Sequence, residues 1–117
     1  MLRRSPPDRV PFWDYDSPLI PNDVRDSSAG SILASGMLIL ATLEKDSARA
    51  HRWRNEAEDL LEALWQRASS RENGDPSILI HATRSKPAGH MDSALIYGDY
   101  YFVEALTRLA APEKLPL

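Results

Sequence analysis

The sequence contains no cysteine, which excludes disulfide bonds, thiolate nucleophiles and cysteine-ligated zinc sites. It also lacks an excess of basic residues, because 14 Lys and Arg face 17 Asp and Glu. The arginines are scattered among acidic residues, so nucleic acid is not expected as a partner. Long hydrophobic runs are missing too. The longest, residues 36–41, is far shorter than the roughly 20 residues that span a bilayer.

Neither a targeting segment nor a metal motif is visible. The polar stretch Ser5–Arg9 follows the first arginines, where the apolar part of a secretion signal would have to begin. We therefore expect no membrane partner and, by default, a cytoplasmic location. The three histidines, His51, His81 and His90, show no helical spacing with a carboxylate, so no metal site and no cofactor are predicted.

What the sequence does contain begins with a proline-rich segment. Residues 1–25 hold five of the nine prolines: Pro6, Pro7, Pro11, Pro18 and Pro21. Each proline removes a hydrogen-bond donor and favours extended geometry before it, which predicts an irregular arm. We expect its aromatic cluster, Phe12, Trp13 and Tyr15, to dock on the rest of the chain.

Asp14 and Asp16 lie close together in this arm. Two neighbouring carboxylates can hold a cation or raise the pKa of one member, which suits acid–base chemistry. In a proline-rich arm an Asx-type turn is the simpler interpretation, and we favour it.

Residues 26–68 predict a helical hairpin. Asp26 can cap a first helix that ends near Leu43, and its small residues would let another backbone approach closely. Asp46 or Ser47 can start a second helix that ends near Ala68, whose apolar face contains Ala50, Trp53, Ala57, Leu60, Leu61, Leu64 and Trp65. We expect Trp53 and Trp65 to pack in the core. The short loop between the helices favours an antiparallel pair.

The remainder predicts a short extended segment with a loop, residues 77–91, and a last helix over 92–109. Asp92 can cap this helix, and its inward positions should be Leu95, Ile96, Tyr100, Val103 and Leu106. Asp99 in its first turn favours the positive end of the helix dipole. The first helix is apolar nearly all round from Ser35 to Leu43, which indicates neighbours on more than one side.

Three motifs together resemble a known family. Residues Pro11–Pro18, Arg25–Gly30 and Ile96–Leu106 are similar, in order and spacing, to the C-terminal part of glycoside hydrolase family 88, the unsaturated glucuronyl hydrolases. The resemblance implies an all-α fold, a C-terminal fragment of an (α/α)6 barrel with about three helices and the proline-rich arm. It implies an unsaturated uronyl oligosaccharide as the partner of the parent enzyme.

The family releases unsaturated uronic acid from oligosaccharides left by polysaccharide lyases, by hydration of the sugar's double bond. This differs from ordinary glycosidases, in which two carboxylates flank the scissile bond. The family's principal catalytic aspartates lie in its N-terminal and middle portions, outside the three motifs. We therefore predict no catalytic residue in this chain and no activity of the chain alone.

The loop Thr83–His90 carries the predicted substrate-binding residues, Arg84, Ser85 and His90. Hydroxyl and cationic groups at a helix N-terminus suit an anionic sugar or sulfate. At this position some family members have the pattern Ser-x-x-Ser-x-Lys, which resembles a contact site for a sulfated sugar. Ser85 matches the first serine, whereas Ala88 and His90 replace the second serine and the lysine. A solvated basic loop is the alternative interpretation.

Two other interpretations of the whole chain stay open at this point. In the first, the chain is a non-catalytic helical interaction module that self-associates or binds a partner through exposed apolar helix faces. Alternatively, it is a truncated gene product. The sequence upstream of Met1 would distinguish the second of these.

Overall fold

The computed structural model describes residues 2–115 and is helical. It contains α1 (Ser27–Leu43), α2 (Ser47–Ala68), α3 (Ile96–Ala110) and two short 3-10 helices, η1 (Leu2–Arg4) and η2 (Pro112–Lys114). Within these residues the extended backbone forms isolated bridges and no longer strand. The described part of the chain is therefore all-α, as the sequence predicts.

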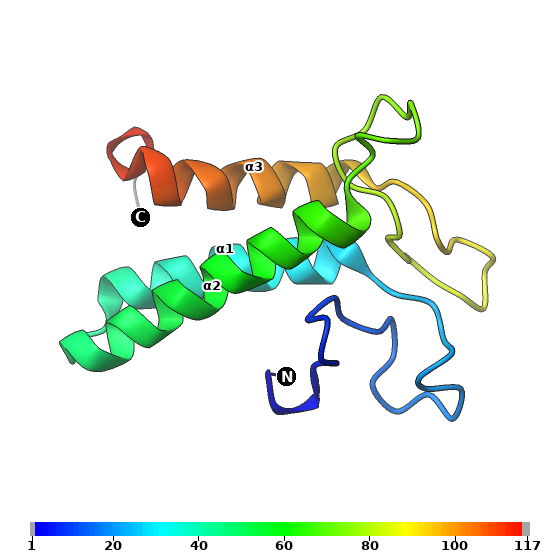
Figure 1. Ribbon diagram of the computed structural model, residues 1–117, viewed down its shortest axis with the longest axis horizontal. Helices are drawn as coiled ribbons and strands as arrows, with labels where there is room; N and C mark the ends of the chain where they lie inside the picture. The colour runs from blue at the N-terminus through cyan, green and yellow to red at the C-terminus, as the bar shows by residue number, and fades with distance from the viewer. Residues whose placement is uncertain (1, 116–117) are drawn as a thin grey trace.

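The helices form an open three-helix arrangement with loops gathered toward one end. α1 packs against both α2 and α3, whereas α2 and α3 make little contact with each other. Figure 1 shows that the arm and the connection over residues 69–95 both lie toward one end of the bundle, where α1 and α3 begin and α2 ends. This end therefore brings distant parts of the sequence together.

Two predicted helix starts are confirmed by their capping hydrogen bonds. The backbone N–H of Ser28 donates to the Asp26 carboxylate at 3.1 Å, at the start of α1. The backbone N–H of Arg49 donates to Asp46 at 3.0 Å, at the start of α2. Both caps lie within three residues of the group they bind, so local sequence determines them.

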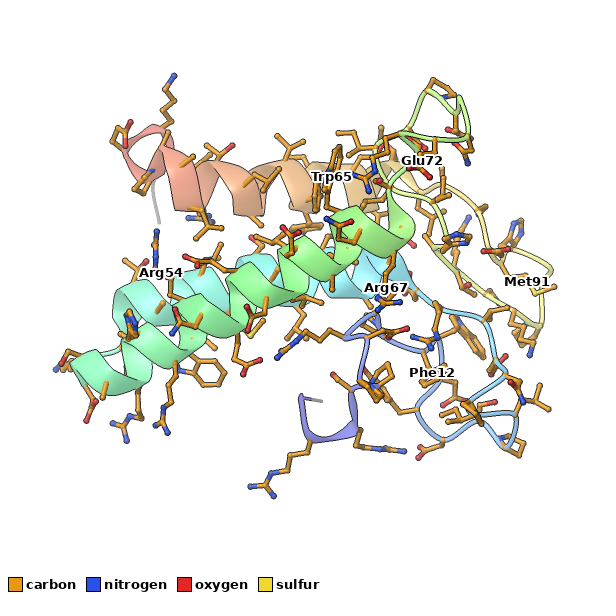
Figure 2. The ribbon with its side chains drawn as sticks, in the orientation of Figure 1. Phe12, Arg54, Trp65, Arg67, Glu72 and Met91 are labelled. Carbon is orange, nitrogen blue, oxygen red and sulfur yellow. The ribbon has the colours of Figure 1, made fainter. Side chains whose placement is uncertain are left out.

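The core lies along α1 where α2 and α3 cover it. Its buried apolar residues include Met37, Leu60, Leu61, Leu64, Leu79 and Phe102. The small residues of α1 allow close approach, as predicted. A Cβ atom added at Gly98 of α3 would lie 3.1 Å from the Cβ of Ser28 in α1. Trp53 packs partly buried against this core, as predicted. The prediction that Trp65 packs in the core is wrong: it keeps 38% of its surface exposed and stacks on Phe102 with ring centroids 6.5 Å apart (Figure 2).

The predicted start of the last helix is wrong. α3 begins at Ile96, after Leu95, and has no side-chain cap. Asp92 cannot cap it, because its backbone has a φ of 49° and its carboxylate is bound to the Nδ1 atom of His81. A tertiary contact thus takes the side chain that local sequence offered to the helix.

The predicted inward face of α3 is also wrong. The residues that α3 buries are Gly98, Phe102 and Ala105. The large apolar side chains of the predicted stripe are exposed: Ile96, Tyr100, Val103 and Leu106. On α1, Ile32 and Leu40 are likewise exposed. The sequence pattern predicts apolar helix faces, but only part of that apolar surface has a neighbour within the described residues.

No helix over residues 2–115 is long and apolar enough to cross a membrane.

Candidate functional site

Residues 82–93 form an irregular hairpin at the loop-rich end of the bundle. Its two antiparallel bridges, Ala82 with Ser93 and Ser85 with His90, share one register. The backbone N–H groups of Arg84 and Ser85 both donate to the His90 carbonyl at 2.9 Å. The chain then reverses over residues 86–89, where Gly89 has a φ of 79° that suits glycine.

The three predicted substrate-binding residues lie together on this hairpin. Ser85 and His90 pair through their backbones near the tip, and Arg84 precedes Ser85. The side chains of Arg84 and His90 are exposed, and neither has a hydrogen-bond or ion-pair partner among residues 2–115. Two cationic or titratable groups and a hydroxyl group are thus available to a ligand. Their binding role stays a prediction.

The base of the hairpin is attached to the start of α1. The Thr83 hydroxyl donates to the Arg25 carbonyl at 2.8 Å, and the Thr83 N–H donates to the Asp26 carboxylate at 3.2 Å. The Ser27 hydroxyl donates to the Ile80 carbonyl at 2.6 Å. Asp26 therefore caps α1 and also holds the hairpin, a second role that its local sequence does not reveal.

Lys86 connects the hairpin tip to the arm. Its Nζ atom lies 2.5 Å from the Oδ1 atom of Asp23, whose side chain is buried. The hydrogen bond from Lys86, aided by bonds from Ser17 and the Val24 backbone, lowers the pKa of Asp23 from 3.8 to about 2. Lys86 is consequently engaged within the chain, which leaves Arg84 as the exposed permanent cation of this hairpin.

We expect this ion pair to make stability depend on acidic pH. Because the folded pKa of Asp23 is lowered, its stabilising contribution is present above pH 3.8 and is lost as pH falls toward about 2. The difference in melting temperature between the parent chain and Asp23→Asn should therefore be largest near pH 5 and should nearly disappear near pH 2. Thermal unfolding followed by circular dichroism measures it. A difference that stays constant over this range would contradict the assignment.

Asp99 binds the extended segment that leads into the hairpin. Its Oδ2 atom accepts the N–H of Ile78 at 3.0 Å and its Oδ1 atom accepts the N–H of Leu79 at 2.9 Å. The same segment is also joined to the end of α2, where the Ile80 N–H donates to the Ala68 carbonyl at 2.7 Å. The Asp99 carboxylate thus holds backbone in place rather than facing solvent as a free acid.

The Asp14 and Asp16 pair forms a turn, as favoured from the sequence. The Asp14 carboxylate accepts the backbone N–H of Asp16 at 2.9 Å, and Asp16 forms an ion pair with Arg4 at 2.6 Å. The neighbouring Phe12 is buried beneath the Arg25 guanidinium, which lies 4.1 Å from the ring centroid (Figure 2). Residues 2–115 contain no group of three potential metal-ligating side chains.

A contact between His81 and Asp92 was not predicted. The Nδ1 atom of His81 lies 2.6 Å from the Oδ1 atom of Asp92, and both side chains are exposed at the hairpin base. No short-range pattern joins two residues eleven positions apart, so this pair becomes visible only when the hairpin register is known.

A large groove lies elsewhere, along α1. It has a volume of about 1070 Å³ and an apolar lining that includes Ile32, Leu33, Gly36, Leu40 and Trp53. Such a lining suits another helix better than a charged sugar, which needs convergent polar groups.

Comparisons with known proteins place the sequence and the fold among relatives of known structure. No protein-family model matches the sequence. Over 92% of its length, the chain is 35% identical to the unsaturated glucuronyl hydrolase of Bacillus sp. (strain GL1), and the match covers 29% of that relative. The crystal structure of the Bacillus sp. GL1 enzyme superposes with a TM-score of 0.85 and 32% identity, over 95% of this chain and 30% of that one.

A third comparison involves a bound sugar. A variant unsaturated glucuronyl hydrolase from Streptococcus agalactiae, complexed with dGlcA-GalNAc6S, matches with a TM-score of 0.83 and 28% identity. The match covers 95% of this chain and 30% of that structure. The fold is thus a segment of an all-α hydrolase barrel, as the motifs implied. In sequence and in fold the chain matches one segment of these unsaturated glucuronyl hydrolases, and it spans about 29% of the length of the curated relative.

Proposed function

We propose that this chain forms one part of a glycoside hydrolase that releases unsaturated uronic acid from lyase-generated oligosaccharides. The observation that carries the proposal is the match to the Bacillus sp. GL1 enzyme, in sequence and in fold, over almost the whole chain. A non-catalytic interaction module would have no reason to retain this similarity along the arm, the three helices and the hairpin together. We therefore favour the hydrolase over that alternative.

The hairpin is the part of the chain that we propose to contact substrate. The guanidinium of Arg84 can bind a carboxylate or sulfate by two parallel hydrogen bonds, which is a strong mode of anion recognition. The hydroxyl of Ser85 and the imidazole of His90 lie next to it on the paired backbone. The dGlcA-GalNAc6S bound by the Streptococcus agalactiae relative is an acidic sugar of the class that such groups suit.

We propose further that the chain alone does not perform the hydrolysis. Three carboxylates near the hairpin are engaged in structural hydrogen bonds: Asp26 caps α1, Asp99 holds the 78–79 backbone and Asp23 binds Lys86. None of these three is free to donate a proton to a substrate. The catalytic groups would then come from the portion of the family fold to which this chain does not correspond.

The exposed apolar faces of α1 and α3 fit this proposal. In a complete barrel of paired helices, each helix has neighbours on two sides, and these faces would supply the contacts. The same faces could join two copies of the chain. Self-association through them stays a prediction.

A transfer experiment tests the proposed function. Incubated by itself with an unsaturated uronyl disaccharide, the chain should leave the absorbance of the substrate's double bond unchanged. A chimera of the Bacillus sp. GL1 enzyme, in which this chain replaces the segment it matches, should consume that double bond. The matched control is the Bacillus enzyme with the segment deleted, which should be inactive.

Each arm of this experiment can fail separately. Double-bond loss catalysed by the isolated chain would refute the statement that it lacks catalytic groups. A chimera that folds, as shown by a cooperative melting transition, but stays inactive would refute the proposed part in the hydrolase.

A further inference from the structure

The described residues contain three non-glycine residues with a left-handed backbone: Arg9, His81 and Asp92. Two of the three contact each other, because the Nδ1 atom of His81 lies 2.6 Å from the Oδ1 atom of Asp92. Their φ angles are 60° and 49°. Aspartate and histidine adopt this conformation more often than most non-glycine residues, but still at a cost in free energy, and such residues concentrate at ligand-binding and catalytic sites. The pair therefore needs an explanation beyond chain reversal.

The hairpin base does not require this side-chain pair for closure. Ala82 and Ser93 already exchange two backbone hydrogen bonds of 2.8 Å there. The His81 carbonyl also accepts the N–H of Ser27 at 3.0 Å, and the Asp92 N–H donates to the Thr83 hydroxyl at 3.3 Å. The backbone on both sides is thus fixed by other contacts. This fixed backbone holds the two side chains together in advance of any ligand.

The chemistry of the pair depends on which imidazole nitrogen carries the proton. A carboxylate only accepts hydrogen bonds, so Asp92 favours the tautomer in which Nδ1 of His81 is protonated. The Nε2 atom then presents a lone pair. His81 has 46% of its side chain exposed, and Nε2 has no partner within residues 2–115. It is therefore an oriented acceptor that is open to a hydroxyl group.

We propose that His81 and Asp92 form a sugar-contacting dyad, in which Nε2 of His81 accepts a hydrogen bond from a hydroxyl of an acidic oligosaccharide. Ser85 lies four residues further along the hairpin, roughly 13 Å of extended chain, so one oligosaccharide can reach both positions. Arg84 and His90 supply the groups for its anionic substituent. The dyad rests on the proposed function for the identity of its ligand, whereas its geometry stands independently.

The experiment uses the full chain and the disaccharide of unsaturated glucuronic acid and 6-sulfated N-acetylgalactosamine. Imidazole nitrogen spectra first identify the tautomer of His81, which should be protonated at Nδ1 in the parent chain and not in Asp92→Gly. Glycine suits the left-handed backbone at this position while it removes the carboxylate. Titration with the disaccharide should then shift the Nε2 resonance of His81.

Matched variants separate ligand contact from structural support. Asparagine tolerates a left-handed backbone, so His81→Asn should keep the fold. It should raise the dissociation constant about tenfold, the effect of losing one hydrogen bond to an oriented group. Asp92→Gly should do the same. The control His51→Asn makes the same change on the exposed part of α2 and should leave binding unchanged. A melting curve of each variant confirms that the fold is retained.

The dyad is overturned if His81 is protonated at Nε2, or if its Nε2 resonance does not move during the titration. It is also overturned if His81→Asn and the parent chain bind the disaccharide equally. Movement of the Ser85 and Arg84 resonances without His81 would reject the dyad and leave the hairpin as the contact. Activity of the chimera decides the proposed function separately from all these outcomes.

Discussion

Asp99→Ala is expected to destabilise the chain by about 2–5 kcal/mol, because two backbone N–H groups lose the carboxylate that they share. Leu79, one of the two donors, is buried, so water cannot replace the lost acceptor there. Most single substitutions cost less than 3 kcal/mol, and small domains have only about 5–15 kcal/mol in total. Urea unfolding measures the loss: the midpoint should fall, while the slope of the unfolding free energy against urea concentration should stay unchanged.

Two further variants test the reason for this effect. Asp99→Asn keeps one carbonyl oxygen, which can accept from one of the two N–H groups, and should fall between the parent chain and Asp99→Ala. Asp59→Ala removes an exposed carboxylate of α2 whose partner Arg9 lies 3.6 Å away, and should change stability by at most about 0.5 kcal/mol. Equal losses for Asp99→Ala and Asp59→Ala would show that the two backbone hydrogen bonds contribute nothing.

The Asp99 contacts also connect stability to the candidate site. Ile78 and Leu79 lead directly to His81 and the hairpin that follows it. When the carboxylate is removed, this segment keeps its hydrogen bonds to the end of α2 but loses those to α3. We therefore infer that Asp99, in the Ile96–Leu106 motif, is a positioning residue for the hairpin.

Local signals in the sequence were sufficient for the first two helices. Asp26 and Asp46 lie next to the N–H groups they cap, and α2 buries four of the seven apolar residues on its predicted face: Ala57, Leu60, Leu61 and Leu64. The turn at Asp14 is local in the same sense. A structural feature whose physical cause lies within a few residues can therefore be predicted from residue types and their spacing.

The errors arise where long-range contacts compete with local ones. Asp92 has the residue type of a helix cap, but its carboxylate binds His81 and its backbone is left-handed. The apolar stripe of α3 is real, yet Tyr100 and Val103 are exposed because α1 contacts a different side of that helix. Periodicity identifies a packing face without identifying its neighbour.

The hairpin over residues 82–93 likewise combines features that are local in sequence with features that are not. The residue types in Thr83–His90 indicated an anion-binding loop, and the resemblance to the family indicated its ligand. The pairing of Ser85 with His90 and the engagement of Lys86 by Asp23 depend on the tertiary structure. A sequence cannot show which of several cations is already neutralised by a residue more than sixty positions away.

Leu64→Ala is expected to destabilise the chain by about 2–5 kcal/mol, because it removes a fully buried side chain and leaves a cavity between α1 and α2. Leu64 has no exposed surface, and its Cδ2 atom would lie 2.9 Å from a Cβ atom added at Gly30 of α1. The glycine and the leucine thus fill one space between the helices. Urea unfolding again measures the change.

This shared space predicts that Gly30→Ala opposes the loss. In the parent chain its new methyl group crowds Leu64, and overpacking of this kind costs about 1–3 kcal/mol against a gain of about 1 kcal/mol in helix propensity. Without the leucine methyl groups, the 2.9 Å contact is removed and only the 3.2 Å approach to Pro11 remains. The double variant should therefore be more stable than Leu64→Ala, with a coupling of about 0.5–3 kcal/mol.

Gly36→Ala provides the matched control for this cycle. It lies on the same helix, and a Cβ atom added there meets nothing within 4 Å. It should stabilise the parent chain and Leu64→Ala equally, by about 0.5–1 kcal/mol, because only helix propensity changes. If Gly30→Ala behaves like Gly36→Ala in both backgrounds, the close packing of α1 on α2 at Leu64 is wrong. A background-dependent effect at Gly30 alone places the contact between these two residues.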